Sequence, residues 1–336
     1  MRIIPVLFII PVSMALLGCP VYNCTTDTLK LPETPFNLVA LNSPYDDWNC
    51  GIPWEEYTPG MEFLFSSNRN TKGGTFDLTP HNLVIQGENN FRTSNDSAWY
   101  GTALMMYSVA KRVNTSLDEL GPTFISLHPI AYYGAWQGAL VYSQGTGSDH
   151  DLHVLSSQDS TFEFMVNDTT ISDQVNDRKL SSLNTSADEG YFAYSDSTRR
   201  ILFHSNRDGK YHIYQATLPD SMTILQWLAS NDSNIQVSRA EVLVGSDGEE
   251  RCPSLHGDTL LFVSDRSGGQ GGFDIYRSIW NGTTWSSPKN LGSKVNSSSN
   301  EYRPVILSFA RGPGILFSSD RAGGLGGYDL YMVKAP

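Results

Sequence analysis

The sequence predicts an all-β protein that folds as a single β-propeller of four-stranded blades. Composition is the first of three observations behind this prediction. The chain has 29 Gly, 17 Pro and 11% aromatic residues, but only 17% charged residues where about a quarter is usual. The second and third observations are a long motif that recurs along the chain and a short acidic motif that precedes each copy. The 336 residues exceed one average domain, but closed β folds often exceed about 200 residues.

The charge balance excludes one class of partner. The chain carries 23 Lys and Arg residues against 35 Asp and Glu residues, which gives a formal net charge of −12. Proteins that bind nucleic acid need clustered cationic side chains to neutralise the phosphates. We therefore expect no nucleic-acid partner.

Residues 1–18 are predicted to be a signal peptide. Arg2 makes the start positive, and the apolar run from Ile3 to Leu17 is shorter than the roughly 20 residues that a membrane-spanning helix needs. The run ends in Leu-Leu-Gly-Cys, and no later stretch approaches spanning length. One interpretation is an ordinary secretory signal in which Cys19 has no special role.

The other interpretation follows from a resemblance, because Leu-Leu-Gly-Cys is similar to the lipobox of bacterial lipoproteins. The resemblance implies that Cys19 is the site of lipid attachment, and several acyl chains anchor a protein durably. Pro20 stands where an Asp would signal retention in the inner membrane. The resemblance therefore implies a lipid anchor in the outer membrane, on its periplasmic face or at the cell surface. Residues 19–34 would be a tether and residues 35–336 the propeller.

Three further cysteines lie in the mature chain: Cys24, Cys50 and Cys252. An exported protein reaches an oxidising compartment, and an odd number of cysteines leaves at least one thiol unpaired within the chain. A Cys24–Cys50 bridge would fasten the N-terminal segment to the body, and three unpaired thiols are the alternative. Their spacing does not match that of a metal site.

The long motif occurs twice almost unchanged, at Leu260–Tyr276 and at Ile315–Tyr331, with an offset of 55 residues. Weaker copies begin at Phe63 and Ile201, and the most eroded copy begins at Ala139. Each copy consists of a short apolar run, a polar stretch and an alternating segment, which predicts strand, loop and strand. A further strand on each side completes four antiparallel strands per repeat. Such units bury their faces by stacking radially as blades.

A turn rich in Asn and Ser followed by an acid precedes each copy of the long motif. The acids are Asp47, Glu119, Glu189, Glu250 and Glu301, at intervals of 72, 70, 61 and 51 residues. One interpretation places these five carboxylates as a ring around one mouth of the axial channel, where a cation or a basic peptide would be favoured. The other makes them caps of the turns, because carboxylates accept hydrogen bonds from nearby backbone amides.

The form Ser-Asp-Arg-x-Gly-Gly-x-Gly-Gly-x-Asp-Ile-Tyr in the fourth repeat resembles the TolB-like propeller repeat, in the version found in outer-membrane proteins of Bacteroidetes type. The five copies predict five blades. TolB has six, so the alternative is a sixth, eroded blade between Asp77 and Glu119. Apolar residues near helical spacing also predict a short helix within Pro219 to Ala229.

The two ends of the chain predict how the ring closes. The last repeat ends after its third strand and lacks an outermost one. Near the N-terminus, Pro-Phe-Asn-Leu at residues 35–38 mirrors Pro-Lys-Asn-Leu at residues 288–291, the segment that ends the fourth repeat. We therefore expect the stretch from Phe36 to Leu41 to supply the missing strand of the fifth blade and to cover its exposed edge.

Several charged residues recur with the motif, which favours a structural role over a single active site. Each arginine has donors enough to bridge a blade to its neighbour, and the aspartates can accept loop amide hydrogens. The alternative is Ca²⁺ bound by the oxygen-rich Gly loops; otherwise no cofactor is expected. These residues are Arg69, Arg207, Asp265, Arg266, Asp274, Asp320, Arg321 and Asp329.

Residues outside the repeat are the candidates for function. Exposed aromatic rings form platforms for sugars or partner surfaces, and the candidate platform residues are Trp48, Trp54, Trp99 and Trp136. The sequence does not decide whether the protein is an enzyme, but it favours a non-catalytic scaffold with a monomeric body, anchored in the envelope, that binds a protein or a glycan. The alternative is a five-bladed glycoside hydrolase, whose channel would need two carboxyl groups about 5 to 10 Å apart.

Overall fold

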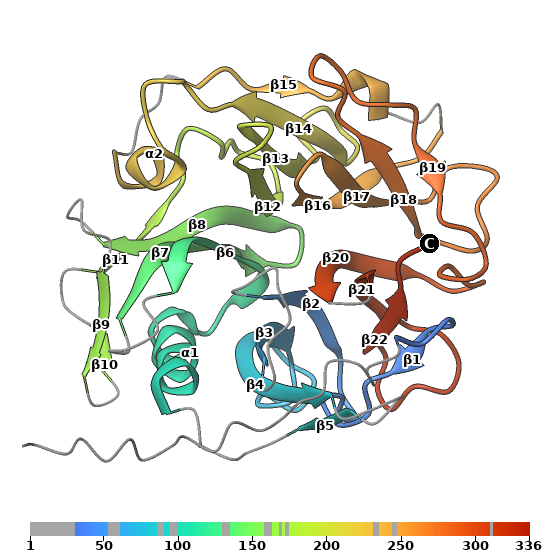
Figure 1. Cartoon of the computed structure of the whole chain (residues 1–336), viewed down its shortest axis with the longest axis horizontal. Helices are drawn as coiled ribbons and strands as arrows, with labels where there is room; N and C mark the ends of the chain where they lie inside the picture. Colours follow the sequence, from blue (N-terminus) through green and yellow to red (C-terminus); the bar gives the residue numbers. More distant parts are fainter. Residues whose placement is uncertain are drawn as a thin grey trace, which may run out of the picture.

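The computed structural model shows five four-stranded antiparallel blades arranged around one axis (Figure 1). The predicted five-bladed propeller is therefore confirmed. The structure describes residues 31–52, 61–85, 91–93, 100–129, 135–157, 163–167, 170–171, 175–230, 235–243, 247–309 and 312–336.

In every blade the acid-bearing strand lies innermost, and these strands contact one another around the axis. Blade 1 consists of β2 (Asp47–Gly51), β3 (Met61–Ser67), β4 (Asp77–Ile85) and β5 (Phe91–Thr93). Blade 2 consists of β6 (Asp118–Pro129), β7 (Ala135–Thr146), β8 (Asp149–Ser157) and β11 (Val175–Lys179). Blade 3 consists of β12 (Glu189–Ser195), β13 (Arg200–Ser205), β14 (His212–Thr217) and β15 (Ser238–Arg239). Blade 4 consists of β16 (Glu250–His256), β17 (Thr259–Ser264), β18 (Asp274–Ile279) and β19 (Lys289–Asn290). Blade 5 consists of β20 (Glu301–Phe309), β21 (Gly312–Ser319), β22 (Asp329–Lys334) and β1 (Phe36–Asn37).

The N-terminal strand closes the ring, as the sequence predicts. β1 pairs antiparallel with β22, with Phe36 opposite Met332. The Asn37 side chain donates a hydrogen bond to Asp329 at 2.9 Å, and the Leu38 amide donates to the Leu330 carbonyl at 2.9 Å. Because β1 completes the fourth strand of blade 5, the two ends of the described chain are held in one sheet.

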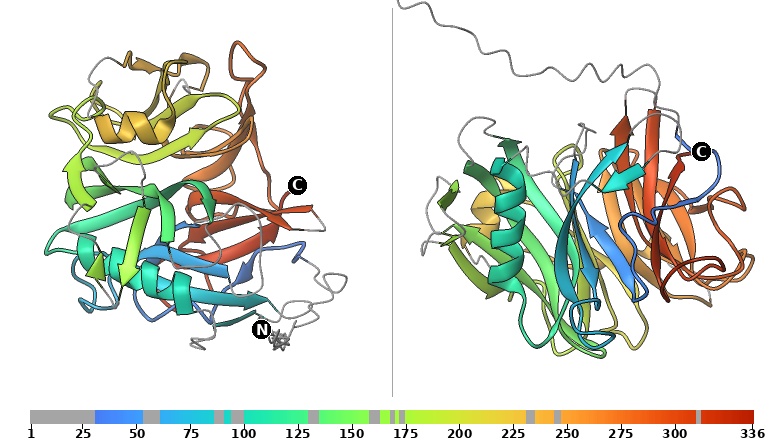
Figure 2. Two further views of the ribbon diagram at one scale, coloured as in Figure 1. Left: turned by 60° about the vertical axis from the view of Figure 1, so that its left-hand side comes forward. Right: turned by 90° about the horizontal axis from the view of Figure 1, so that it is seen from below.

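Between Asp77 and Glu119 the described residues form the two outer strands of blade 1 and a helix, and not a sixth blade. α1 (Tyr100–Val113) lies along the outer side of blades 1 and 2 (Figure 2), and its buried Val109 and Val113 pack in one cluster with Leu140 of β7. The six-bladed alternative is therefore wrong. The helix lengthens the interval between the first two repeats without adding a blade, because an amphipathic segment can cover a blade without pairing its backbone to it.

Other additions decorate the ring without altering it. The predicted short helix is present as α2 (Ile224–Ser230), which buries Leu225, Trp227 and Leu228. Blade 2 carries two more short strands, β9 (Glu163–Asn167) and β10 (Thr170–Ile171), and blade 4 is preceded by a 3-10 turn, η2 (Glu241–Leu243). No helix in the described part of the chain is long and apolar enough to cross a membrane.

All five innermost strands contain a bulge at the same place. The second residue after each acid has a positive φ between 44° and 59°, and the pairing register shifts there in every blade. These residues are Asn49, Gly121, Tyr191, Cys252 and Arg303. Left-handed backbone is unfavourable for residues other than glycine, so the surrounding packing must impose it. A bulge bends its strand, and here it does so where the five strands converge.

Candidate functional site

The bulge residues close the axis of the propeller. Arg303 of blade 5 donates to the Pro253 carbonyl of blade 4 at 3.0 Å and to the Thr123 hydroxyl of blade 2 at 2.6 Å, so its side chain crosses the axis. The guanidinium is buried, which lowers its pKa. Tyr191 fills the neighbouring space, since a Cβ on Gly121 would lie only 2.6 Å from its ring. We call Asn49, Gly121, Tyr191, Cys252 and Arg303 the axial plug.

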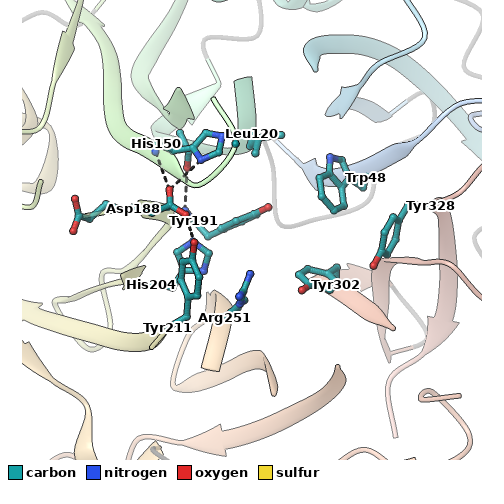
Figure 3. Close-up of a pocket in the computed structure, with 14 residues that line it drawn as sticks. Trp48, Leu120, His150, Asp188, Tyr191, His204, Tyr211, Arg251, Tyr302 and Tyr328 are labelled. Atoms are coloured by element: carbon teal, nitrogen blue, oxygen red, sulfur yellow. Dashed lines mark hydrogen bonds and ion pairs between the residues drawn. The ribbon is translucent and has the colours of Figure 1, made fainter. Parts of the chain in front are cut away.

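A cavity of about 340 Å³ opens against the plug at the end of the axis where the innermost strands begin. Figure 3 shows Trp48, Tyr302 and Tyr328 on one side of this axial cavity and His150, Asp188 and Tyr211 on the other, with Tyr191 between them. Its lining comes from all five blades. Sites for small molecules are typically concave, largely apolar and equipped with a few polar groups, so the axial cavity is the candidate functional site.

One side of the axial cavity is an aromatic wall. The ring centroid of Trp48 lies 5.0 Å from that of Tyr328 and 6.1 Å from that of Tyr302, and the two tyrosines meet edge to face at 5.8 Å. Such tilted and edge-on contacts are favourable for aromatic pairs. Trp48 and Tyr302 follow the repeat acid directly, and Tyr328 precedes the aspartate that starts β22. The repeat itself therefore places these rings at the mouth.

The opposite side is a polar wall built on Asp188. Its Oδ1 accepts a hydrogen bond from the His150 backbone amide at 2.9 Å and lies 3.0 Å from the His150 ring nitrogen Nδ1. Its Oδ2 accepts a hydrogen bond from the Tyr211 hydroxyl. Burial by itself would raise the pKa of Asp188, but these hydrogen bonds and the nearby His204 lower it to about 2. Asp188 is therefore ionised and fully engaged at neutral pH.

Two further residues complete the polar side. Burial lowers the pKa of His204 to about 3, so the imidazole is neutral, and its Nδ1 accepts the Cys252 amide hydrogen at 3.5 Å. The Arg251 guanidinium lies 3.7 Å from the ring centroid of Tyr211 and donates to Glu249 at 2.5 Å. A guanidinium stacked on a ring face in this way is held flat against the wall.

The five repeat acids lie behind the axial cavity, in its supporting turns. All five are fully buried, and of the five only Glu189 is among the lining residues. Asp47, Glu189 and Glu301 accept backbone amide hydrogens from the preceding turn. These three acids have the turn-capping arrangement, and apart from Glu189 the repeat acids leave the cavity wall to other residues.

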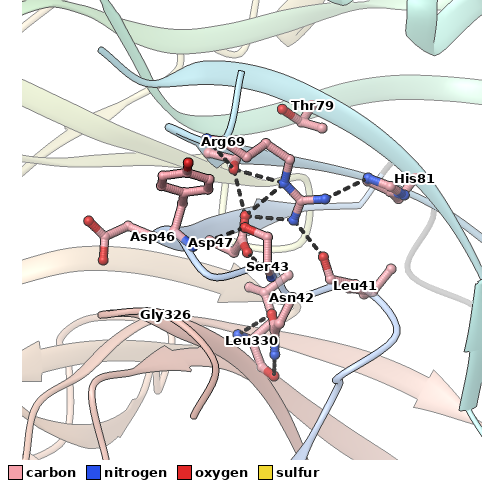
Figure 4. Close-up of polar contacts among 12 residues, drawn as sticks. Leu41, Asn42, Ser43, Asp46, Asp47, Arg69, Thr79, His81, Gly326 and Leu330 are labelled. Atoms are coloured by element: carbon pink, nitrogen blue, oxygen red, sulfur yellow. Dashed lines mark hydrogen bonds and ion pairs between the residues drawn. The ribbon is translucent and has the colours of Figure 1, made fainter. Parts of the chain in front are cut away.

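Four of the acids are paired with the repeat arginines. Figure 4 shows the pair in blade 1, where Arg69 bonds both Asp47 and the Leu41 carbonyl of the segment that arrives from blade 5. The same arrangement recurs as Arg207 with Glu189 at 3.1 Å, Arg266 with Glu250 at 2.9 Å and Arg321 with Glu301 at 2.8 Å. Each arginine thus fastens its blade to the connection from the preceding blade.

Blade 2 lacks this ion pair. Glu119 accepts from the Thr115 hydroxyl at 2.7 Å and from the Gln144 amide at 3.0 Å, and Thr146 stands at the arginine position. Its Oε2 is buried without a partner in the described part of the chain. Burial raises the pKa of Glu119 to about 7. The hydrogen bonds of this carboxyl group lie within blade 2 and its turn, away from the polar wall.

The motif aspartates bind loop backbone. Asp265 and Asp320 accept the amide hydrogens of Glu249 and Asn300, each at 2.7 Å. Asp274 and Asp329 accept amide hydrogens from their own Gly-rich loops. Among the residues that the structure describes, no group of three or more His, Cys, Asp or Glu side chains is arranged to hold a metal ion.

The predicted platform residues separate into three cases. Trp48 lies in the aromatic wall. Trp136 lies near the start of β7, with its backbone between Pro129 of β6 and Phe164 of β9, and it is not among the residues that line the axial cavity. Trp54 and Trp99 lie outside the described residues, as do Cys19 and Cys24. Cys50 and Cys252 are buried free thiols, so Cys50 forms no bridge here.

Sequence reasoning missed most of the cavity lining, although a signal was present. The position directly after each repeat acid supplies Trp48 and Tyr302. The position that precedes the motif aspartate in blades 1, 4 and 5 supplies Tyr328, and the equivalent positions in blades 2 and 3 supply His150 and Tyr211. Those positions converge only because the strands are arranged radially. Asp188 also has a signal, because an acidic residue directly precedes the repeat acid in three other repeats, at Asp46, Asp118 and Glu249. Tyr191 and His204 have no comparable signal in the sequence.

No protein-family model matches the sequence, and no well-characterised protein sequence matches it either. Solved structures do resemble it. An endo-arabinase from Bacteroides thetaiotaomicron shares 10% identity and a TM-score of 0.50, covering 91% of this chain and 97% of that one. A putative TolB from Agrobacterium tumefaciens shares 13% identity and a TM-score of 0.41 over 90% and 97% of the two chains. At these identities the likeness concerns the propeller fold alone.

Proposed function

We propose that this protein is a non-catalytic binding module, anchored in the bacterial outer membrane through Cys19, whose axial cavity captures a protein or glycan of the envelope. The observation that carries the binding role is the cavity itself, which is closed below by the axial plug and lined by Trp48, Tyr302 and Tyr328 on one side. The anchor rests on the Leu-Leu-Gly-Cys sequence that ends at Cys19.

The alternative of a glycoside hydrolase has weaker support. Such enzymes need an acid and a second carboxylate facing each other across the bound sugar. The acidic residues that line the axial cavity within the described chain are Asp188 and Glu189, which are neighbours in sequence. Asp188 is engaged by His150 and Tyr211, and Glu189 is engaged by Arg207. Both carboxylates are therefore already engaged by neighbouring side chains, and they do not face each other across the cavity from different blades.

Capture from envelope fractions tests the binding role. The wild-type protein and a Tyr107→Ala control should retain the same partner, because Tyr107 is an exposed aromatic residue on α1, outside the axial cavity. Trp48→Ala should lose that partner, because it removes the centre of the aromatic wall. Equal retention by all three proteins would contradict a role for the cavity.

The lipid anchor is tested by substitution of the predicted attachment site. Cys19→Ser should release the protein from the membrane fraction and abolish acylation.

The glycoside-hydrolase alternative is tested by hydrolysis assays on a panel of glycosides, which should show no turnover. Turnover that is lost in Glu119→Gln or Glu189→Gln would establish an enzyme instead.

A further inference from the structure

The axial cavity can be entered from one side only. Tyr191 belongs both to its lining and to the axial plug, and directly behind it Arg303 crosses the axis to blades 2 and 4. A polymer therefore cannot thread through the ring. Whatever occupies the cavity must present an end to it.

The two walls differ in chemistry. Trp48, Tyr302 and Tyr328 offer ring surface on one side, whereas Asp188, Tyr211 and His204 offer polar groups on the other (Figure 3). A pyranose or furanose ring has the same asymmetry, with C–H groups that pack on aromatic surface and hydroxyl groups that make hydrogen bonds. An apolar side chain would leave the second ring nitrogen of His204 without a hydrogen-bond partner, which is costly once water is excluded.

The charges around the axial cavity are already paired. Glu189 lies 3.1 Å from Arg207, and Arg251 lies 2.5 Å from Glu249. Asp188 receives hydrogen bonds from His150 and Tyr211. An ionic ligand would have to displace one of these partners, because the lining offers no unpaired opposite charge. A neutral ligand meets no such cost.

His204 supplies a donor suited to a hydroxyl group. Its imidazole is 95% buried, and its Nδ1 accepts the Cys252 amide hydrogen. In the neutral ring the remaining hydrogen is then on Nε2. The Tyr302 and Tyr328 hydroxyls at the opposite wall can both donate and accept.

We infer that the axial cavity binds the terminal unit of a neutral sugar, stacked on the aromatic wall and hydrogen-bonded to the polar wall. The inference rests on the proposed binding function and narrows its ligand class. A volume of about 340 Å³ is at the lower end of the range for small-molecule sites, which suits one or two sugar rings and not a long chain.

The test is a titration of the full mature protein, followed by saturation-transfer NMR and tryptophan fluorescence. The probes are methyl glycosides of neutral hexoses and pentoses, short oligosaccharides that carry each sugar at the end or only internally, and methyl glucuronide as the anionic counterpart. At least one neutral glycoside should bind. Trp48→Ala should weaken that binding at least about tenfold, while the matched aromatic variant Tyr107→Ala should leave it unchanged.

The oligosaccharides separate the two sources of the sugar. An oligosaccharide with the preferred unit at its end should bind at least as tightly as the free glycoside if the ligand is a glycan, and more weakly if it is a free sugar. Either result supports the inference. Binding of an oligosaccharide that carries the unit only internally would overturn the closed-end geometry.

Failure of the sugar inference is distinguishable from failure of the proposed function. If no neutral sugar binds at up to about 10 mM, or if the glucuronide binds more tightly, the inference is overturned. If Trp48→Ala then still loses its envelope partner, the cavity binds a protein or a charged glycan and the proposed function stands. If no neutral sugar binds and Trp48→Ala retains the envelope partner, both the inference and the proposed function are contradicted.

Discussion

Blade 2 and the other four blades share one backbone and differ in their charges. All five have a buried acid at the start of the innermost strand and a bulge two residues later. In blades 1, 3, 4 and 5 an arginine pairs with that acid, whereas in blade 2 Gln144 and Thr115 bind Glu119 instead. The ion pair is therefore not required for the geometry of a blade. Its contribution is stability and the link to the preceding blade.

Blade 2 also departs from the others where it faces the axial cavity. His150 occupies the position that Phe76, Tyr211, Phe273 and Tyr328 occupy in the other blades, and it contacts Asp188 of the turn that leads into blade 3. The most eroded repeat thus supplies the polar wall with its histidine. At this blade the departure from the repeat pattern therefore coincides with the presence of a histidine in the wall of the axial cavity.

The largest effect should come from removing an arginine in a paired blade. Arg321→Ala leaves the fully buried Glu301 without its cation and should destabilise the protein by about 3–5 kcal/mol. Urea unfolding measures this. The control is Thr146→Ala at the equivalent exposed position of blade 2, which should stay within about 0.5 kcal/mol. Equal losses at the two positions would remove the distinction between the blades.

The second effect is a pH dependence that originates in blade 2. The pKa of Glu119 is raised from about 4.5 to about 7 by burial, so the folded state holds its proton more tightly than the unfolded state does. Its contribution to stability is complete below pH 4.5 and is lost as the pH rises to about 7, by at most about 3 kcal/mol. Glu119→Gln should flatten this part of the pH profile, whereas Thr115→Ser, which keeps the hydroxyl, should preserve it.

A third test rebuilds the repeat in blade 2. Gln144→Ser combined with Thr146→Arg restores the Ser-x-Arg pattern opposite Glu119. The new cation should lower the pKa of Glu119 below 7 and stabilise the protein by about 1–2 kcal/mol, the range of a hydrogen bond to a charged group. NMR titration of the Glu119 carboxyl reads the pKa directly. An unchanged pKa would show that blade 2 differs in more than its missing arginine.

The smallest effect is expected at the polar wall. His150→Phe restores the aromatic residue of the repeat and removes the ring contact to Asp188, while the backbone hydrogen bond from residue 150 remains. The pKa of Asp188 should rise above 2 with a stability change of about 1 kcal/mol. Phe273→Leu at the equivalent position of blade 4 is the control and should leave the pKa of Asp188 in place.

Much of the fold could be predicted from local pattern. The repeats at Leu260–Tyr276 and Ile315–Tyr331 specify the same strands and loops, and the mirrored segment at residues 35–38 identifies the closing strand. α1 could not be predicted in this way. Its residues have no repeat to align with, and what holds them helical is packing of Val109 and Val113 against blades 1 and 2.

The site was less accessible to sequence reasoning for a geometric reason. Trp48 and Tyr328 are 280 positions apart in the chain yet lie 5.0 Å apart between ring centroids, because the ring brings its first and last blades together. A repeat whose acids recur at intervals of 51 to 72 residues shows that equivalent positions exist, but not which way their side chains face.

The sequence was sufficient to predict five repeats, the closing strand, the acid of every blade and the arginine of four blades, since these features depend on short-range pattern and repetition. The three-dimensional structure was needed to show that Asp47, Glu189 and Glu301 cap turns and that Arg303 and Tyr191 block the axis. It was also needed to show that an aromatic wall and a polar wall face each other above them. Burial and charge pairing depend on which strands meet at the axis. The meeting of those strands is a property of the closed ring, and no single repeat contains it.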